Sequence, residues 1–325
     1  MARPVCVFRA GQVCSMAPAV NAITGYHIIL NARSGNRDVD GKCAVIRDVL
    51  GSAGSRYRLH IVKDARKLRE TAIRVVNEAR QDGGAVVIAG GDGSINTVAQ
   101  AVLGSGCVFG VLPQGTFNYF GRTHGIPEDL AEAARALLRA EVRPVQVGLL
   151  NNRIFLVNAS LGLYPKLLED REFYKRQLGR SRLVALWSAL VTLWRSHRIL
   201  RVRMDGEDGG RDLVTQTVFV GNNALQLEQV GIPLASQLDN GRLAVVTLKP
   251  VGPMAMLGLM LRGAFGKLDA ADSVVSFAAR ELTVKPKFVL SAWTKVATDG
   301  EIFWLRAPLR FKVASEPLLL LKPPA

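Results

Sequence analysis

The 325-residue sequence contains only four cysteines and four histidines, and neither residue type is clustered. The cysteines all lie in the first third of the chain without a CxxC pair, so we expect reduced thiols in a cytoplasmic protein rather than a disulfide framework. The histidines are too far apart in sequence to indicate a zinc cluster. No Ser/His/Asp signature of a hydrolase is recognisable either.

Long apolar runs are also missing. No stretch reaches the about 18 consecutive apolar residues that a transmembrane helix needs. Residues 1 to 22 include two prolines and two cysteines but no continuous apolar segment, which argues against a signal peptide. We predict that residues 1–24 form a loose N-terminal extension, with Met16 as an alternative start.

Acidic residues are scarce: 27 Asp and Glu stand against 42 Lys and Arg, a formal charge of +15. Such a balance favours an anionic partner, which means nucleic acid, an anionic membrane surface or a phosphorylated substrate. The chain has no recognisable module that places basic and aromatic residues on one surface, so no nucleic-acid partner is predicted. The hydrophobic content of 49% suffices for two ordinary domain cores.

The most informative stretch is AVVIAGGDGSINTVAQAVL at 85–103. Residues 85–89 form a short apolar run typical of a buried strand, and glycines at 90, 91 and 93 make a sharp turn. From Ser94 the apolar residues recur at helical spacing. A strand, tight turn and helix start place free backbone N–H groups at one point, which is suited to phosphate.

Asp92 puts a carboxylate at this anion site. A divalent cation between the carboxylate and a phosphate would make it tolerable, and so would a role in accepting a proton from an attacking hydroxyl. The alternative is that Asp92 merely caps the helix, because Asp is a preferred N-cap residue. Residue type alone leaves these alternatives open.

Two further strands end in small polar turns: residues 26–30 before NARSG at 31–35, and residues 108–112 before PQGTFN at 113–118. Strands alternating with helices predict a parallel, Rossmann-like sheet whose ligands lie outside the carboxyl ends of its strands. We therefore predict an α/β domain over 25–145. Residues 146–313 have short strands and frequent turns, which predicts a mainly antiparallel β-sandwich or barrel-like domain. Residues 314–325 are a candidate last strand of the first domain.

Four motifs, GGDGS at 90–94, NARSG at 31–35, LPQGTFNYFGRTHGIP at 112–127 and TDGE at 298–301, together give a resemblance. The chain resembles the diacylglycerol kinase catalytic-domain superfamily over about residues 25–321. It looks most like the bacterial soluble lipid kinases, which also resemble sphingosine and ceramide kinases. The resemblance implies a kinase that uses ATP and Mg²⁺ to phosphorylate a diacylglycerol-like or sphingoid lipid, with the β-rich domain binding the lipid.

The resemblance also assigns residues. It implies that Asp92 is needed for activity and that Glu301 is the general base on the lipid hydroxyl, with Asp299 beside it as a third catalytic residue. Without the resemblance, Asp299 and Gly300 would read as a hairpin turn, for which Asp-Gly is a strong signal. The implied nucleotide-binding residues come from the three glycine-bearing turns: Asn31, Ser34, Gly35, Gly91, Gly93, Ser94, Asn96, Thr97, Gly115, Thr116 and Asn118.

Some positions depart from the family pattern. Tyr119 stands where the family usually has Asp, and Thr97 where it has Glu. A structural metal site of the second domain would use Asp239 and Asn240, but Asn240 occupies an aspartate position, so that site is weakened or lost unless Asp239 substitutes. These departures keep open a non-catalytic lipid or nucleotide sensor on the same fold. An NAD kinase-like GGDG enzyme is a second alternative.

The segment RLVALWSALVTLWR at 182–195 carries Trp187, Trp194 and Arg195, a pattern typical of a helix lying in a lipid interface. An ordinary core helix is the alternative. A second segment, 251–268, has three methionines among leucines, which suits an adaptable acyl-chain groove or plain core filling. We expect a cytoplasmic protein that meets its lipid substrate peripherally at a membrane surface, and a homodimer is left open.

Overall fold

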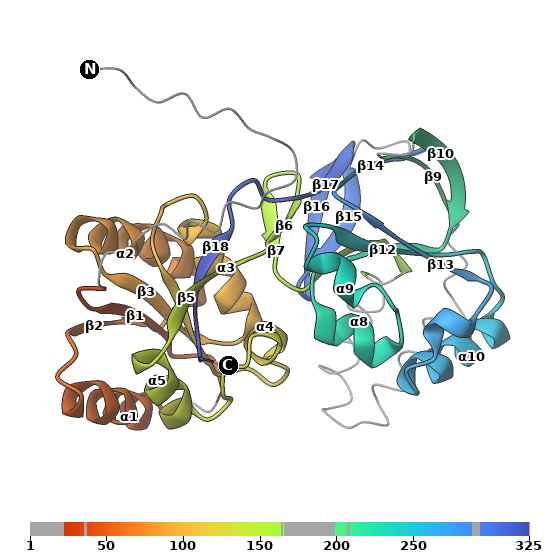
Figure 1. Cartoon of the computed structure of the whole chain (residues 1–325). Coiled ribbons are helices and arrows are strands. Elements are labelled where there is room, and N and C mark those ends of the chain that lie inside the picture. The colour runs from red at the N-terminus through yellow and green to blue at the C-terminus, as the bar shows by residue number, and fades with distance from the viewer. Residues whose placement is uncertain are drawn as a thin grey trace, which may run out of the picture.

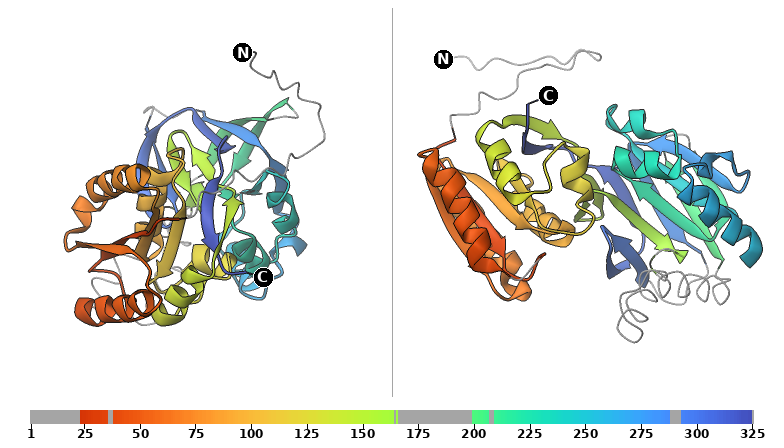
Figure 2. Two further views of the ribbon diagram at one scale, coloured as in Figure 1. Left: turned by 60° about the vertical axis from the view of Figure 1, so that its left-hand side comes forward. Right: turned by 90° about the horizontal axis from the view of Figure 1, so that it is seen from below.

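The structure is a computed structural model that describes residues 23–35, 38–163, 165, 199–206, 209–287 and 293–324. These residues form two domains that lie side by side (Figures 1 and 2). The predicted lipid contacts Trp187, Trp194 and Arg195 lie outside the described residues. Among the described helices, none is both long and apolar enough to cross a membrane.

The first domain is built on a six-stranded sheet of order β2-β1-β3-β4-β18-β5. Its strand β3 is buried at all six positions, because helices cover both faces of the sheet. Helices α2 and α3 lie on one face, and α1 and α5 lie on the other (Figure 1). The strands are β1 (Tyr26–Asn31), β2 (Tyr57–Val62), β3 (Ala85–Gly90), β4 (Phe109–Pro113), β5 (Glu141–Val145) and β18 (Leu318–Lys322). The helices are α1 (Val39–Ser52), η1 (Ala65–Lys67), α2 (Leu68–Asp82), α3 (Asp92–Val102), α4 (Tyr119–Thr123) and α5 (Leu130–Leu138).

Strands β1 to β4 pair in parallel, as the alternation of strands and helices predicts. The C-terminal strand β18 returns from the second domain and lies between β4 and β5, parallel to β4 and antiparallel to β5. The predicted α/β domain with a parallel sheet is therefore confirmed, with one antiparallel pair at its edge.

The second domain packs two six-stranded sheets face to face, and every strand pair described in it is antiparallel. Apolar side chains from both sheets, among them Phe155, Val220 and Phe311, form its core. The predicted β-sandwich is confirmed. One sheet contains β6 (Gly148–Leu150), β7 (Arg153–Phe155), β9 (Leu200–Gly206), β10 (Gly209–Thr215), β14 (Glu281–Pro286) and β17 (Leu309–Val313). The other contains β8 (Asn158–Gly162), β11 (Thr217–Gly221), β12 (Leu243–Leu248), β13 (Val274–Ala279), β15 (Trp293–Thr298) and β16 (Glu301–Arg306).

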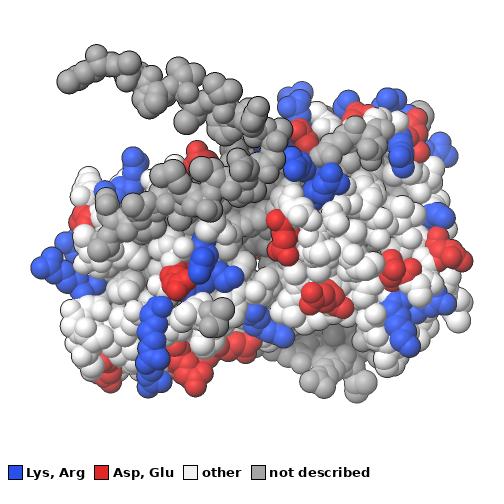
Figure 3. All heavy atoms as spheres, in the orientation of Figure 1, with Lys and Arg blue, Asp and Glu red and all other residues white. Residues whose placement is uncertain are grey.

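Short helices pack on the outer face of the β11–β12–β13 part of this second sheet. They are α8 (Ala224–Val230), α9 (Ala235–Leu238), α10 (Pro253–Ala264) and η2 (Leu268–Ala270). On the face drawn in Figure 3, Lys and Arg side chains are scattered over both domains among Asp and Glu side chains. The positive charge of the chain is therefore not gathered into one patch on that face.

Candidate active site

Three loops meet at the carboxyl ends of β1, β3 and β4. Because these strands are neighbours in the parallel sheet, their ends share one edge. The Asn31 side-chain amide at the end of β1 donates a hydrogen bond of 2.8 Å to the Ser94 hydroxyl in the first turn of α3. Gly35 has a φ of 67°, and a Cβ on it would lie 2.8 Å from the carbonyl oxygen of Gln114. The first loop is thus in contact with both of the other loops.

The second and third loops touch through bare backbone. A Cβ on Gly91 would lie 3.3 Å from the Cα of Gly115, and a Cβ on Gly115 would lie 2.7 Å from Asn118 Oδ1. Asn118, at a φ of 48°, holds the third loop: its Oδ1 accepts from Gly115 N at 2.8 Å and its Nδ2 donates to Gly115 O at 3.1 Å. A glycine-lined surface of this kind lets a phosphate approach backbone N–H groups closely.

Four other residues predicted to bind nucleotide differ in how they are engaged. Ser34 Oγ lies 3.5 Å from Ser94 Oγ inside the loop cluster, and Thr116 is exposed. Thr97 donates its hydroxyl to Gly93 O at 2.9 Å within α3. The Asn96 amide is directed at the second domain rather than at the loops. All four assignments stay predictions, and Asn96 has a clear structural use.

Asp92 is the first residue of α3, and the N-cap is Gly91, with no side-chain capping bond. The capping alternative is therefore wrong. Oδ1 of Asp92 is buried without a hydrogen-bond partner. Burial raises the pKa of this carboxyl, and the nearby backbone N–H groups of Phe120, Asn118 and Tyr119 offset part of that effect. A half-buried carboxylate with one unpartnered oxygen beside a phosphate-type loop is the arrangement expected for binding a cation or receiving a proton.

Asp299 and Gly300 join β15 to β16 with φ values of 47° and 84°, so the hairpin turn predicted from Asp-Gly is confirmed. Both Asp299 oxygens are occupied. Oδ2 accepts from Asn96 Nδ2 and from Leu156 N at 2.7 Å each, and Oδ1 accepts from the N–H groups of Val157 and Asn158 at 2.9 Å each. Burial nevertheless raises its pKa. We assign Asp299 a positioning role, because it ties α3 of the first domain to the second domain.

Glu301, two residues after Asp299, lies against the GGDG loop. Its Oε1 is 2.8 Å from the point where a Cβ on Gly93 would lie, so a side chain at 93 would displace the carboxylate from its present position. The residue as a whole is exposed, with its carboxyl end turned inward to this contact. Burial of the carboxyl raises its pKa, the charge of Asp299 raises it further, and Arg153 lowers it. A carboxylate with a raised pKa suits proton transfer.

Two supporting residues of the site were not predicted from the sequence. Arg153 on β7 lowers the pKa of Glu301 through its positive charge. Its guanidinium group lies over the Phe303 ring, with the guanidinium carbon 3.9 Å from the ring centroid. Lys42 on α1 is buried and donates to the Ser34 carbonyl oxygen at 2.6 Å, which fixes the first loop. Neither belongs to a motif, so only the fold reveals them.

The predicted metal ligands Asp239 and Asn240 lie at the end of α9. The Asn240 amide donates to Ser236 O at 3.3 Å, within its own helix turn. Across the described ranges, no group of three His, Cys, Asp or Glu ligands includes Asp239. A metal at this point stays a prediction.

Comparisons with known proteins agree with this geometry. Residues 25–150 match the model of the diacylglycerol kinase catalytic domain. A Klebsiella pneumoniae (strain 342) protein named "Probable lipid kinase YegS-like" is 39% identical over 113 residues, 33% of this chain and 38% of that protein. A Pseudomonas aeruginosa (strain UCBPP-PA14) protein of the same name is 34% identical over 156 residues, 47% of this chain and 49% of that protein. The "Diacylglycerol kinase" of Bacillus subtilis (strain 168) is 39% identical over 88 residues, 26% of this chain and 29% of that protein.

These alignments span half or less of the curated relatives' length. A crystal structure described as a diacylglycerol kinase from Bacillus anthracis str. Sterne has a TM-score of 0.71 at 20% identity, covering 94% of this chain and 99% of that one. That likeness extends the shared fold over both domains. With the domain match, the curated relatives and the motif loops in agreement, residues 25–150 belong to the diacylglycerol kinase catalytic-domain superfamily.

Proposed function

We propose that the chain is an ATP- and Mg²⁺-dependent lipid kinase that phosphorylates a hydroxyl of a diacylglycerol-like or sphingoid lipid. One observation carries the proposal: Glu301 lies on Gly93, so the late TDGE motif and the GGDG loop form a single site across two domains. Asp92, the residue before Gly93 in the same loop, has one carboxylate oxygen, Oδ1, without a hydrogen-bond partner. The match to the diacylglycerol kinase catalytic domain and to probable lipid kinases supports a lipid as the phosphate acceptor.

The residues present fit a nucleotide and a divalent cation. Where Gly91 and Gly115 are in contact, the backbone carries no side chain, and a Cβ on either residue would fill the space beside it. A phosphate cradle requires such accessible backbone. The orphaned Asp92 oxygen is the type of ligand that Mg²⁺ prefers. Bound ATP would supply the γ-phosphoryl group, and Mg²⁺ would neutralise its charge.

In the transfer step, the lipid hydroxyl oxygen forms a bond to the γ-phosphorus while the bond to the β-phosphate oxygen breaks and ADP leaves. The hydroxyl proton goes to the Glu301 carboxylate. Asp299 holds the hairpin that presents Glu301, and Arg153 offsets part of the rise that burial and Asp299 cause in the pKa of that carboxyl. Phosphoryl transfer requires mainly positioning and charge stabilisation, so this small set of groups suffices.

An apolar pocket of about 400 Å³ in the second domain is the proposed acyl-chain site. It lies between the outer face of β11 and β12 and the helices α8 and α10, and its lining includes Phe219, Leu227, Val246, Met256, Leu259 and Met260. Two of the three methionines of segment 251–268 thus line the pocket. Met254 is 73% exposed and does not line it. The flexible methionines suit chains of varied shape.

Filling this pocket is expected to weaken lipid use selectively. Met260→Trp places a large ring at the pocket wall, so we expect KM for a long-chain lipid to rise roughly tenfold while KM for ATP stays unchanged. Leu261→Trp is the matched control, because Leu261 is 55% exposed on the same helix and does not line the pocket. Equal KM values for the two variants would rule out this pocket as the acyl site.

The function is tested by following labelled γ-phosphate from ATP into micellar diacylglycerol, sphingosine, ceramide and phosphatidylglycerol, with NAD included. Transfer to one lipid is expected. Transfer to NAD alone would favour the NAD kinase-like alternative. ATP binding without transfer to any acceptor would favour the sensor. Sedimentation with anionic and neutral vesicles tests the proposed peripheral membrane association in the same preparation.

A further inference from the structure

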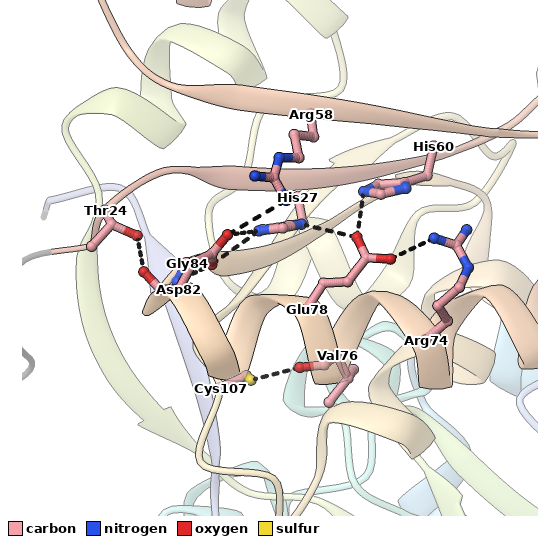
Figure 4. A network of polar contacts seen from close by, with 10 residues as sticks. All are labelled: Thr24, His27, Arg58, His60, Arg74, Val76, Glu78, Asp82, Gly84 and Cys107. Carbon is pink, nitrogen blue, oxygen red and sulfur yellow. Dashed lines mark hydrogen bonds and ion pairs between the residues drawn. The ribbon is translucent and has the colours of Figure 1, made fainter.

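A second cluster of ligand-type side chains lies at the opposite end of the first sheet from the loops. His27 is the second residue of β1 and Asn31 is its last, so the two residues are about 13 Å apart along the strand. His27, His60 of β2 and Glu78 of α2 bring three ligand atoms within 4.8 Å of one another. Figure 4 shows Glu78 reaching from α2 toward both rings. Widely spaced in sequence, these residues meet only in the fold.

The ligand atoms of His27 and His60 that face Glu78 lie beyond hydrogen-bond distance from it. His27 Nδ1 is 3.9 Å and His60 Nε2 is 3.8 Å from the same oxygen, Glu78 Oε2. Both ring nitrogens are buried and have no hydrogen-bond partner. His27 is only 3% exposed, so its unpartnered nitrogen has no access to bulk water. An orphaned buried nitrogen costs stability and requires an explanation.

The outer atoms of the cluster are held by a second set of partners. His27 Nε2 lies 3.1 and 3.0 Å from the two oxygens of Asp82, which accept a hydrogen bond from Nε2–H. In this tautomer Nδ1 keeps a free lone pair. Arg74 donates to Glu78 Oε1 at 2.6 Å, which leaves Oε2 facing the rings. A carboxylate behind a metal-binding histidine is the usual way in which proteins fix the tautomer of such a ligand.

We propose that His27, His60 and Glu78 bind a divalent transition-metal ion of the Zn²⁺ class, separate from any ion bound with ATP. Two imidazoles and one carboxylate are a zinc ligand set that leaves a fourth position for water. The side chain of Glu78 is 30% exposed, so water reaches that position. Bound metal would join β1, β2 and α2, and its role would be structural.

Only a small rearrangement separates the described geometry from a metal-bound one. Ligand atoms around tetrahedral zinc lie about 3.3 Å apart, against 3.8 and 3.9 Å here. The two rings are near parallel, 11° apart, so one ring must turn for both lone pairs to meet. His60 lies on β2, the edge strand of the sheet, and its side chain is 12% exposed.

The test is Zn²⁺ titration of the metal-free full chain against a chromophoric chelator, with Mg²⁺ in excess. We expect wild type to bind one equivalent more than His60→Gln or Glu78→Gln. Saturating Zn²⁺ should also raise the Tm of wild type by roughly 5 °C and have no such effect on the two variants. Glu70→Gln is the matched control, because Glu70 is exposed two turns earlier on α2.

The cysteines are the same in all four proteins, so any zinc they bind cancels in the comparison. Circular dichroism establishes that each variant is folded before titration, and Glu78 lies on a helix surface where glutamine is well tolerated. Equal zinc stoichiometry in wild type and His60→Gln would overturn the proposal. So would a loss of the extra equivalent in Glu70→Gln. Retained kinase activity in the variants leaves the proposed function intact, since the two sites are separate.

Discussion

Asp92→Asn is expected to lower phosphoryl transfer by roughly 10²–10⁴-fold and to raise the stability of the fold at the same time. The loss of activity follows from the proposed role, because a neutral amide can neither bind a divalent cation strongly nor accept a proton. The gain in stability follows from the described structure. Oδ1 of Asp92 is buried without a hydrogen-bond partner, and burial raises the pKa of the carboxyl.

A carboxyl whose pKa is higher in the folded state than in the unfolded state is held in its disfavoured form at pH 7. Protonation relieves that cost, and so does replacement by asparagine. The Tm difference between Asp92→Asn and wild type should therefore shrink as the pH falls through the raised pKa of Asp92.

Transfer rates at saturating lipid and thermal melts at several pH values provide the measurements. Asp40→Asn is the matched control, because Asp40 lies exposed in the first turn of α1 and should leave transfer unchanged. A variant with normal transfer would remove Asp92 from the mechanism. A variant that loses both transfer and stability would instead indicate a structural role.

The strands and helices of the first domain could be predicted from sequence because the patterns that indicate them are local. The strand predicted at 85–89 is observed as Ala85–Gly90, and its glycines end it at the predicted turn. An apolar run, a glycine turn and a helical repeat each involve a few neighbouring residues, so no knowledge of distant contacts is needed. The hairpin at Asp299 and Gly300 was predictable for the same reason.

The contacts that bring the residues of the site together could not be predicted from the sequence. Asn96 and Asp299 are 203 positions apart, and nothing in either motif indicates that one side chain binds the other. The family resemblance implies a catalytic role for Asp299, whereas the oxygens of its carboxylate accept hydrogen bonds from four N–H donors. The spacing of His27, His60 and Glu78 along the chain does not indicate their cluster, because strand pairing and helix packing set the distances between them in space.

Glu301→Gln is expected to lower kcat/KM by roughly 10²–10⁴-fold and to remove the acid limb of its pH profile. A general base works only when ionised, so wild-type kcat/KM should rise with pH through the pKa of Glu301. Burial and the charge of Asp299 raise that pKa above its ordinary value of 4.5. The acid limb should therefore lie above pH 4.5.

Arg153→Gln tests the same assignment without touching the carboxylate. Arg153 lowers the pKa of Glu301, so its loss should move the acid limb to higher pH while leaving the rate on the plateau close to wild type. Lys295→Gln is the matched control: Lys295 is a cation over an aromatic ring of the same hairpin, 5.0 Å from the Trp304 centroid, and does not affect the Glu301 pKa. If the limb does not move in Arg153→Gln, or persists in Glu301→Gln, another group is the base. Asp92 would then be the leading candidate, because it is the other half-buried carboxylate of the site with a raised pKa and an unpartnered oxygen.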